Sequence, residues 1–535
     1  MAKCCQPSIR NALWPGVIIS CFLNFIFFLV VYSLWRHMPL ISWREFMEDS
    51  YLWHVIGFTF WQALLSTLLS VIPSIFLAKS LFRRHFPGRI LFLRLHTMIF
   101  VLPVFVVIMG VFTVYGRTGW IAQLCQWLGI VYQFNLYGIK GILLVHVFFN
   151  MPLAIRMLLQ ALDSISIEQR QLALQLGMNP WYFFRFVEWP YLRRQILPTS
   201  SLIFMLCFAS FATVLTLGGG PASTTIELAI YQSLSYDFDL NKAAFLSLVQ
   251  IFCCLSLVLF NQKFNVSFSS GYSSRFLWKN EDDSRWSRWW DFFLISCAIW
   301  FFILPLLAII IEGMNAKLLL RLLQQSGLWS SFFNSIYIAI NAGVLCMIFT
   351  IMLLWTKREL RLRRLKFFNH IFELSELLIL AVPSIVLAVG FFLLLKNTVN
   401  LTSSSYSLII VTNALMAVPY AVKILENPMY DLAERYNALC ISLQIKGINR
   451  LYLIEFKALK RLMAQTFSFS CLLSIGDFGI IALFGNDNFC TLPCYLYQQL
   501  GSYRQSDAVV TALLLLSLCL GLFSLLEYLS GKEYD

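Results

Sequence analysis

The sequence predicts an all-α membrane protein with about twelve transmembrane helices in two parallel repeated halves. Three observations lead to this fold class. The 535-residue chain is 59% hydrophobic and only 13% charged, with a mean hydropathy of +0.73. Soluble proteins are only about 45–50% apolar, so a soluble class is excluded. The apolar residues also form long runs, and the two halves share an ordered pattern of polar residues and prolines.

Each apolar run is long enough to cross a bilayer, whose hydrocarbon core requires about 20 residues per helix. The runs lie at residues 13–35, 53–79, 95–115, 136–159, 199–217, 243–262, 291–312, 332–355, 373–395, 405–425, 466–485 and 507–528. The first run follows Lys3 and Arg10, as in a signal peptide. It extends to Trp35 without a small-residue cleavage site, so we interpret it as a retained helix.

The basic residues indicate orientation rather than nucleic-acid binding. The net charge is +13, but Lys and Arg lie in short loops between apolar runs instead of on one soluble face. With the N-terminus inside, 31 of the 40 Lys and Arg residues fall in cytoplasmic segments and 9 fall outside. This positive-inside bias predicts that both termini are cytoplasmic and that the chain's surroundings are membrane lipid.

An internal repeat divides the chain into two halves. The matched pairs include Glu188 with Glu455, Pro152 with Pro419 and Phe211 with Phe478 at a shift of 267 residues, and Pro103 and Gly110 with Pro383 and Gly390 at a shift of 280. An even number of spans separates the copies, so both have the same orientation. Such parallel repeats predict a translocation path between the halves.

The repeat sets the expected domain limits. We expect an extra helix in 1–52, a first transmembrane domain in 53–262, a cytoplasmic linker in 263–290, an extra helix and external loop in 291–328, a second transmembrane domain in 329–528 and a cytoplasmic tail in 529–535. The linker is rich in serine and mixed charge, so it has no core of its own.

The longest cytoplasmic loop of the first half, 163–198, is predicted to be structured. Residues 168–177 contain good helix formers and end at Gly177, which suits a left-handed helix cap. A second helical stretch, 181–188, is expected to stop near Pro190. Two short helices that meet at a glycine form a rigid knob that can transmit force. The alternative is an interfacial helix pair that rests on lipid through Trp181 and Trp189.

At these residues the loop resembles the signature loop of binding-protein-dependent ABC importer permeases, which implies a type I importer fold. The residues that match the signature are Gln171, Leu172 and Ala173 for its triplet, then Gly177 and Pro190. In the second half the repeat register gives Ala438, Leu439 and Cys440, with Gln444 and Lys457 in place of the glycine and proline. The second motif is therefore degenerate, although Gly447 could supply a turn.

The resemblance implies that each loop contains a coupling helix that fits an ATPase subunit. We place these helices at about 161–177 and 428–444, with Leu176 and Leu443 among the coupling residues. The expected partners are two copies of an ABC ATPase and a periplasmic substrate-binding protein, in a bacterial inner membrane. The chain contains no phosphate-binding P-loop motif and no clustered catalytic or metal-ligating set, so we expect ATP on the partner, no cofactor here and no enzymatic activity.

Longer strings resemble the permeases for thiamine and thiamine pyrophosphate. They lie at 168–173, 184–190, 217–221, 225–232, 474–479 and 496–503. Fused ferric-iron permeases share the two-half plan and remain the alternative. A secondary transporter with twelve spans in parallel halves is less consistent with large cytoplasmic loops and few midplane charges. A membrane-embedded enzyme is disfavoured because no catalytic set converges.

Acidic residues at membrane depth are candidates for the translocation path. Asp477 lies between glycines in an apolar run, and Glu227 lies near the external end of the corresponding segment of the first half. With Phe478 and Tyr231 they could attract a cationic aromatic substrate. Alternatively, Asp477 pairs with a backbone group where the glycines loosen the helix. Cys490 and Cys494 could pair in an external loop, and most other cysteines are expected to be buried hydrophobes.

Overall fold

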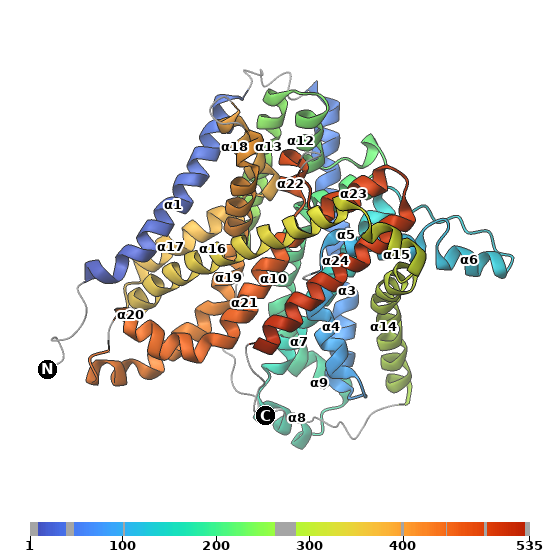
Figure 1. Cartoon of the computed structure of the whole chain (residues 1–535). Coiled ribbons are helices and arrows are strands. Elements are labelled where there is room, and N and C mark those ends of the chain that lie inside the picture. The colour runs from blue at the N-terminus through green and yellow to red at the C-terminus, as the bar shows by residue number, and fades with distance from the viewer. Residues whose placement is uncertain are drawn as a thin grey trace. The chain divides into compact units, whose positions relative to one another are not determined.

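The computed structural model describes residues 9–38, 48–99, 102–262, 285–396, 401–445, 447–485 and 489–529. The regular elements in these ranges are helices, as the sequence predicts (Figure 1). Most of the expected linker and nearly all of the expected C-terminal tail lie outside the described residues.

Nine segments of the described chain are long and apolar enough to cross a membrane, and two bent helix pairs raise the number to eleven. The nine are Leu13–Arg36, Ser50–Arg83, Val104–Trp127, Ile139–Asp163, Leu240–Gln262, Arg285–Gly313, Ser326–Leu362, Ser405–Ser442 and Gln505–Ser524. The pairs are Pro180–Phe208 with Phe211–Leu217, bent by 54°, and Phe367–Leu380 with Ser384–Leu395, bent by 86°. The all-helical membrane class is thus confirmed. The nine to eleven candidate spans of the described residues are fewer than the twelve or so that the sequence predicts.

Several expected spans are interrupted where the sequence suggested one helix. Helix α4 (Arg89–Ile99) is followed by α5 (Val104–Tyr115), and α17 (Lys366–Leu380) is followed by α18 (Ser384–Leu395). Pro103 and Pro383 are the N-cap residues of α5 and α18. A proline has no N–H to donate and disfavours a helical conformation at the residue before it, so each proline starts a new helix.

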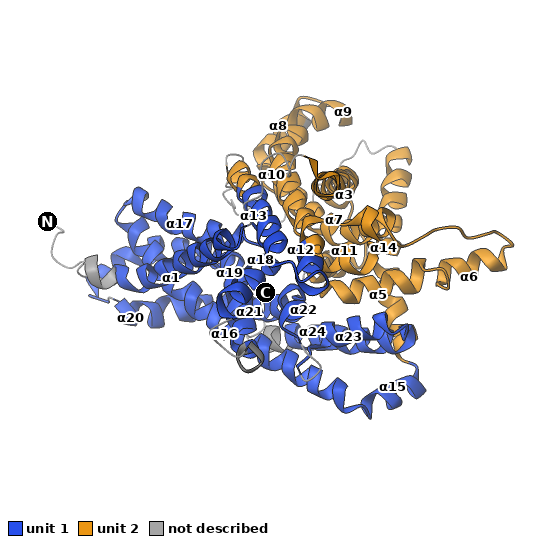
Figure 2. Ribbon diagram, turned by 90° about the horizontal axis from the view of Figure 1, so that it is seen from above, with its two compact units in different colours: residues 1–40, 230–255, 315–535 blue, residues 41–229, 256–314 orange. Residues whose placement is uncertain are grey.

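The described chain forms two compact units that do not follow chain order. Unit 1 contains residues 1–40, 230–255 and 315–535, and unit 2 contains residues 41–229 and 256–314 (Figure 2). Helix α1 (Ile9–Arg36) therefore belongs to the unit built mainly from the second half. Helix α14 (Arg285–Gly313) belongs to the unit built from the first half. The two extra helices are exchanged between the halves.

Hydrogen bonds attach each exchanged helix to a long span of its unit. In unit 1, the Gly16 N–H of α1 donates to Thr356 Oγ1 of α16 (Ser326–Leu362) at 2.9 Å. In unit 2, Ser80 of α3 (Ser50–Arg83) donates to Asp291 Oδ1 of α14 at 2.7 Å. Arg84 Nε donates to the other carboxylate oxygen of Asp291 at 2.8 Å. Buried polar groups of these spans are thus satisfied by the exchanged helices.

Close helix packing explains why glycine occurs at the repeated positions 110 and 390. A Cβ atom on Gly390 would lie 2.5 Å from Val30 Cγ1 of α1, and one on Gly110 would lie 2.6 Å from the carbonyl oxygen of Pro305 of α14. Real Cβ atoms do not approach other heavy atoms so closely. Both glycines therefore provide room for an exchanged helix to pack against α18 or α5.

We predict that Gly110→Ala and Gly390→Ala destabilise the protein by about 1–3 kcal/mol each, because the added methyl group overpacks the contact with the exchanged helix. The measurement is the thermal unfolding midpoint of the purified protein in detergent. Gly57→Ala and Gly521→Ala are matched controls, since no heavy atom lies within 4 Å of a Cβ there. The controls should be neutral or stabilising by up to about 1 kcal/mol. A similar loss in all four variants would contradict the explanation.

Candidate functional site: the cytoplasmic loops

In the first predicted coupling loop, a short helix lies between two turns. Helix α7 (Ile139–Asp163) ends before it, so residues 161–163 of the expected coupling helix belong to α7. The short helix is α8 (Ile167–Gln175), and Gly177 follows it with a left-handed φ of +60°. The Asn179 side chain then accepts a hydrogen bond of 3.0 Å from the Tyr182 N–H. These turns fix the direction of α8.

In the second loop the expected coupling helix is the end of a longer helix. Helix α19 (Leu401–Ser442) continues without a break through residues 428–442, although Pro428 lies inside it. Gln444 then adopts a left-handed φ of +55°, and Gly447 adopts one of +59°. The second loop is therefore a rigid extension of a membrane span, whereas α8 is separated from α7.

Both loops end their helix with the same hydrogen bond. The Met178 N–H donates to the Ala173 carbonyl at 3.1 Å, and the Ile445 N–H donates to the Cys440 carbonyl at 2.9 Å. These atoms are related by the repeat shift of 267 residues. The pattern is a Schellman-type helix end, which normally has glycine at the left-handed position. Gln444 holds that conformation at a cost of about 1–2 kcal/mol, so the degenerate motif keeps its turn.

Equivalent side chains at the two helix ends are also buried or exposed alike. Ala173 and Cys440 are buried, whereas Gln171 and Ala438 are exposed. Four leucines project outward, with exposed fractions of 56% for Leu172, 63% for Leu176, 48% for Leu439 and 60% for Leu443. Leucines four positions apart share one helix face. Each loop thus presents an exposed leucine pair, which we call its coupling surface.

A π-helical turn follows each loop at the same repeat position. The turns are η1 (Phe184–Glu188) and η3 (Leu451–Phe456), and they lead into α10 (Trp189–Phe208) and α21 (Lys457–Gly476). The sequence predicts that the helical stretch 181–188 stops near Pro190. Pro190 instead lies in the first turn of α10, which continues the helix. The proline is tolerated there because a first-turn N–H has no helical partner. Such π-turns are rare and often mark functional sites.

Each π-turn carries a buried glutamate that faces basic side chains. Glu188 is almost fully buried in unit 2, and its Oε2 lies 3.8 Å from Lys79 Nζ and 3.9 Å from Arg83 Nη2 of α3. Lys79 also lies over the Phe184 ring at 3.6 Å. The two bases remain partly exposed, so this pairing is loose.

The corresponding pair in unit 1 is tighter. Arg358 of α16 is fully buried, and its Nη1 donates to both carboxylate oxygens of Glu455. Its Nη2 donates to Glu359 Oε1 at 2.6 Å, and Arg450 Nε lies 3.5 Å from Glu455 Oε1. Hydrogen bonds between two charged groups are roughly twice as strong as those between neutral groups. Glu188 and Glu455 match in the sequence repeat, but their roles depend on distant partners that no local pattern reveals.

A buried guanidinium supports each loop from a different position. Arg170 of α8 donates from Nη2 to the Leu162 carbonyl at 2.8 Å. Arg450 donates from Nη2 to the Ala433 carbonyl at 3.0 Å and from Nη1 to Asn437 Oδ1 at 3.2 Å. Burial lowers the pKa of the Arg170 guanidinium, and the carboxylates of Asp163 and Glu188 oppose this shift. Asn437 is the repeat equivalent of Arg170, so the second loop obtains its arginine from α20 (Gly447–Arg450).

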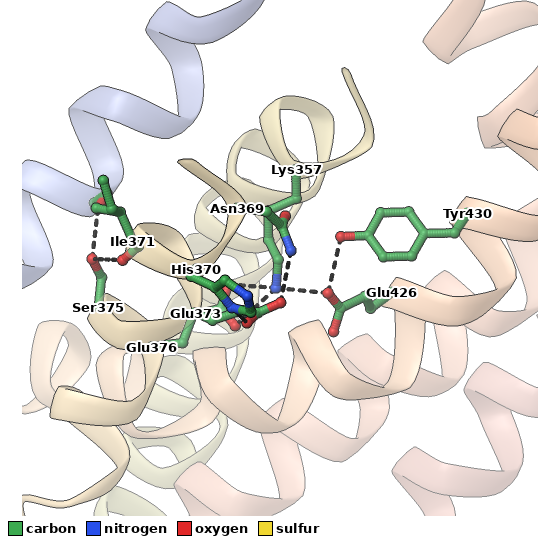
Figure 3. A network of polar contacts seen from close by, with 10 residues as sticks. Lys357, Asn369, His370, Ile371, Glu373, Ser375, Glu376, Glu426 and Tyr430 are labelled. Carbon is green, nitrogen blue, oxygen red and sulfur yellow. Dashed lines mark hydrogen bonds and ion pairs between the residues drawn. The ribbon is translucent and has the colours of Figure 1, made fainter. Parts of the chain in front are cut away.

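A further network holds the α19 extension in unit 1 (Figure 3). Lys357, next to Arg358, lies 2.7 Å from Glu426 Oε1 of α19 and 3.2 Å from Glu376 Oε2 of α17. The Tyr430 hydroxyl donates to Glu426 at 2.9 Å. One buried ammonium therefore binds two carboxylates, and α16, α17 and α19 are tied together just before the second coupling surface.

The candidate path residues of unit 1 lie beside a helix start. Asp477 is buried, and its carboxylate accepts hydrogen bonds from the Ser384 hydroxyl and the N–H groups of Gly479 and Ile480. Asp477 is the C-cap residue of α21 (Lys457–Gly476), and the next residue, Phe478, is the N-cap of α22 (Gly479–Phe484). The Oδ2 of Asp477 is buried without a hydrogen-bond partner among the described residues. The neighbouring Phe478 ring packs at 5.2 Å from the Tyr497 ring.

Glu227 and Tyr231 lie on α12 (Ile226–Ser235) and are both buried. Tyr231 packs edge-to-face with Tyr236 at 6.0 Å. The path role of these residues stays a prediction. Cys490 and Cys494 are not joined by a disulfide in the described structure, and the Cys490 thiol donates to the Thr491 carbonyl at 3.4 Å.

Known proteins resemble the chain along its whole length. Residues 70–265 match the family model of the binding-protein-dependent transport system inner membrane component. The thiamine transport system permease protein of Escherichia coli K12 is 55% identical over 100% of this chain and 99% of its own. The proteins of that name in Haemophilus influenzae and Brucella abortus 2308 are 41% and 40% identical, over 98% and 91% of this chain and 97% and 89% of their own.

These similarities define a multi-pass inner membrane permease component of a binding-protein-dependent transport system. Such a component works with a binding protein and an ATPase. More narrowly, the chain belongs to the family of thiamine transport system permease proteins.

We predict that Glu455→Gln lowers the free energy of unfolding by about 3–5 kcal/mol, because it removes the carboxylate that binds Nη1 of the fully buried Arg358. Glu188→Gln should cost about 1 kcal/mol or less, since Lys79 and Arg83 can turn toward water. Denaturant unfolding of the purified variants measures both. The double variant Arg358→Met with Glu455→Leu should recover part of the loss, because it removes both charges. Equal losses in the two single variants would contradict the different strengths of the pairs.

Proposed function

We propose that this chain is the membrane-spanning subunit of an ATP-driven importer for thiamine or thiamine pyrophosphate, delivered by a periplasmic binding protein. The observation that supports this most is the full-length similarity to thiamine transport system permeases, with 55% identity to one relative. Both halves, 53–262 and 329–528, are the proposed functional repeats, and both termini are proposed to be cytoplasmic.

In this proposal the two coupling surfaces dock two ATPase subunits, which bind the ATP. The residues proposed to form or support the first surface are Gln171, Leu172, Ala173, Leu176 and Gly177, with Pro190 behind it, and those of the second are Ala438, Leu439, Cys440, Leu443 and Gln444. The exposed leucine pairs support this role because a soluble partner can bury them. The shared helix end and the buried glutamates give each surface a rigid base.

The proposed translocation path includes Asp477 and Phe478 in unit 1, with Tyr231 and Glu227 on α12. Thiamine carries a positive charge on an aromatic ring, so a carboxylate and aromatic rings suit it. The unpartnered Oδ2 of Asp477 supports a role in charge attraction.

The test of the proposed function is uptake by the permease reconstituted into vesicles with its ATPase and binding protein. We expect uptake of labelled thiamine that stops when ATP is replaced by a non-hydrolysable analogue. Uptake of ferric iron in place of thiamine would favour the ferric-iron alternative. Thiamine uptake that continues on an ion gradient alone would favour a secondary transporter.

For the coupling surfaces, we predict that Gly177→Pro reduces co-purification of the ATPase at least tenfold while the chain still inserts into the membrane. Proline cannot adopt the φ of +60° at this position, so the end of α8 must change direction. Gly88→Pro is the matched control, because Gly88 has a φ of +87° in a cytoplasmic turn outside the coupling surfaces. ATPase association that is unchanged by Gly177→Pro, or lost equally in both variants, would contradict the assignment.

A further inference from the structure

The first half contains an external segment that the second half lacks. Gly110 and Pro152 are 42 positions apart, but their repeat equivalents Gly390 and Pro419 are 29 positions apart, a difference of 13 residues. The extra residues fall between α5 and α7 and include α6 (Trp120–Trp127). Nothing in the repeated plan requires this segment, so it serves a purpose of the first half alone.

The segment is uncharged and aromatic. Residues 118–138 contain no Asp, Glu, Lys, Arg or His, but they include Trp120, Trp127, Tyr132 and Tyr137. Tryptophan and tyrosine are enriched at membrane–water interfaces, where an apolar ring body and a polar group are both satisfied. A surface that faces only water usually contains charged residues as well.

Helix α6 has a face that packs on the protein and an exposed apolar face. Ala122 is buried against the protein, whereas Leu124, Trp127 and Leu128 are exposed at i, i+3 and i+4 spacing. Ile130 and Val131 continue this apolar strip beyond the helix. The exposed fraction is 82% for Trp127 and 79% for Val131. We call Leu124, Trp127, Leu128, Ile130 and Val131 the apolar strip.

The apolar strip is too short to cross the bilayer. Although Val104–Trp127 passes as a candidate span by length and composition, residues 116–119 interrupt it between α5 and α6. Helix α6 has eight residues and is about 12 Å long, compared with about 30 Å for the hydrocarbon core. An amphipathic helix of this kind lies in the plane of the interface.

The beginning of α6 is fixed at the end of a membrane span of the same unit. Trp120 Nε1 donates to Glu312 Oε1 at 3.0 Å, and Glu312 is next to the last residue of α14. On α14, Trp300 and Ile311 are exposed on the surface that a membrane span presents to lipid. In both views α6 lies at the edge of unit 2, beyond α5 (Figures 1 and 2). The apolar strip is therefore continuous with the lipid-facing surface.

A hollow of about 610 Å³ lies beside the apolar strip. Its polar lining includes Arg117, Gln123, Gln126 and Tyr132, and among the described residues that line it Arg117 alone is charged. A single cation next to an apolar strip complements a phospholipid, whose anionic phosphate lies beside its acyl chains.

We propose that α6 and residues 128–131 form an anchor in the outer leaflet of the membrane, with the apolar strip in the acyl region and Arg117 near the lipid phosphates. The anchor holds the external end of unit 2 at a fixed depth. It does not depend on which substrate is transported.

The test uses benzoylphenylalanine, a photoreactive residue, at position 127 or 131 of the complete transporter. The protein is reconstituted into vesicles of phosphatidylethanolamine and phosphatidylglycerol with ³²P-labelled phosphates, and the binding protein is present. We expect labelled lipid adducts at both positions at least fivefold above those at position 503. Tyr503 is the matched control, because it is 92% exposed in the turn between α23 (Leu492–Gly501) and α24 (Gln505–Leu529).

Two variants separate anchoring from general folding. Leu124→Asp should reduce the lipid adduct at position 131 at least threefold, because a charge is costly in the acyl region, whereas Leu124→Met should leave it unchanged. Crosslinks mainly to the binding protein, or to a second copy of the chain, would overturn the proposal in favour of a protein contact. Lipid labelling no higher than at position 503 would also overturn it.

Discussion

The architecture around the two coupling loops depends on the burial of charge. A carboxylate removed from water is strongly destabilising unless a base or several hydrogen bonds compensate it. Glu188 and Glu455 are both almost fully buried, and each faces basic residues of a long span in its own unit. The π-turns that carry them cannot move away from these spans without leaving a buried charge unpaired. The loops are therefore mechanically linked to the membrane helices.

The two halves satisfy this constraint with different residues. In unit 2 the supporting arginine is Arg170, on the coupling helix itself, whereas in unit 1 it is Arg450, on the far side of the turn. Among the described residues, the bases near Glu188 lie at 3.8 and 3.9 Å, so the closer contact of Arg358 with Glu455 has no counterpart there. The two loops are thus similar in shape but unequal in rigidity, which sharpens the asymmetry that the degenerate second motif suggests.

The sequence predicts the membrane class and the left-handed turn at Gly177, because these depend on hydrophobic runs and on local turn chemistry. It does not predict that Gln444 keeps the left-handed turn, because tertiary contacts can impose a conformation that local preference disfavours. The exchange of α1 and α14 is also hidden, since contacts between distant segments leave little local signal. The repeated glycines at positions 110 and 390 are a local sign of this exchange. Their reason lies in the close packing against Pro305 and Val30, which the sequence does not show.

The ionic contacts and the helix exchange meet at adjacent residues. On α3, Lys79 faces the buried Glu188 and the next residue, Ser80, binds Asp291 of the exchanged α14. On α16, Arg358 binds Glu455, and two residues earlier Thr356 accepts the Gly16 N–H of the exchanged α1. Within each unit, less than one turn of a long span thus connects a coupling loop to a helix from the other half of the chain. A tilt imposed on either loop must therefore act on segments of both halves, even if only one ATPase subunit moves.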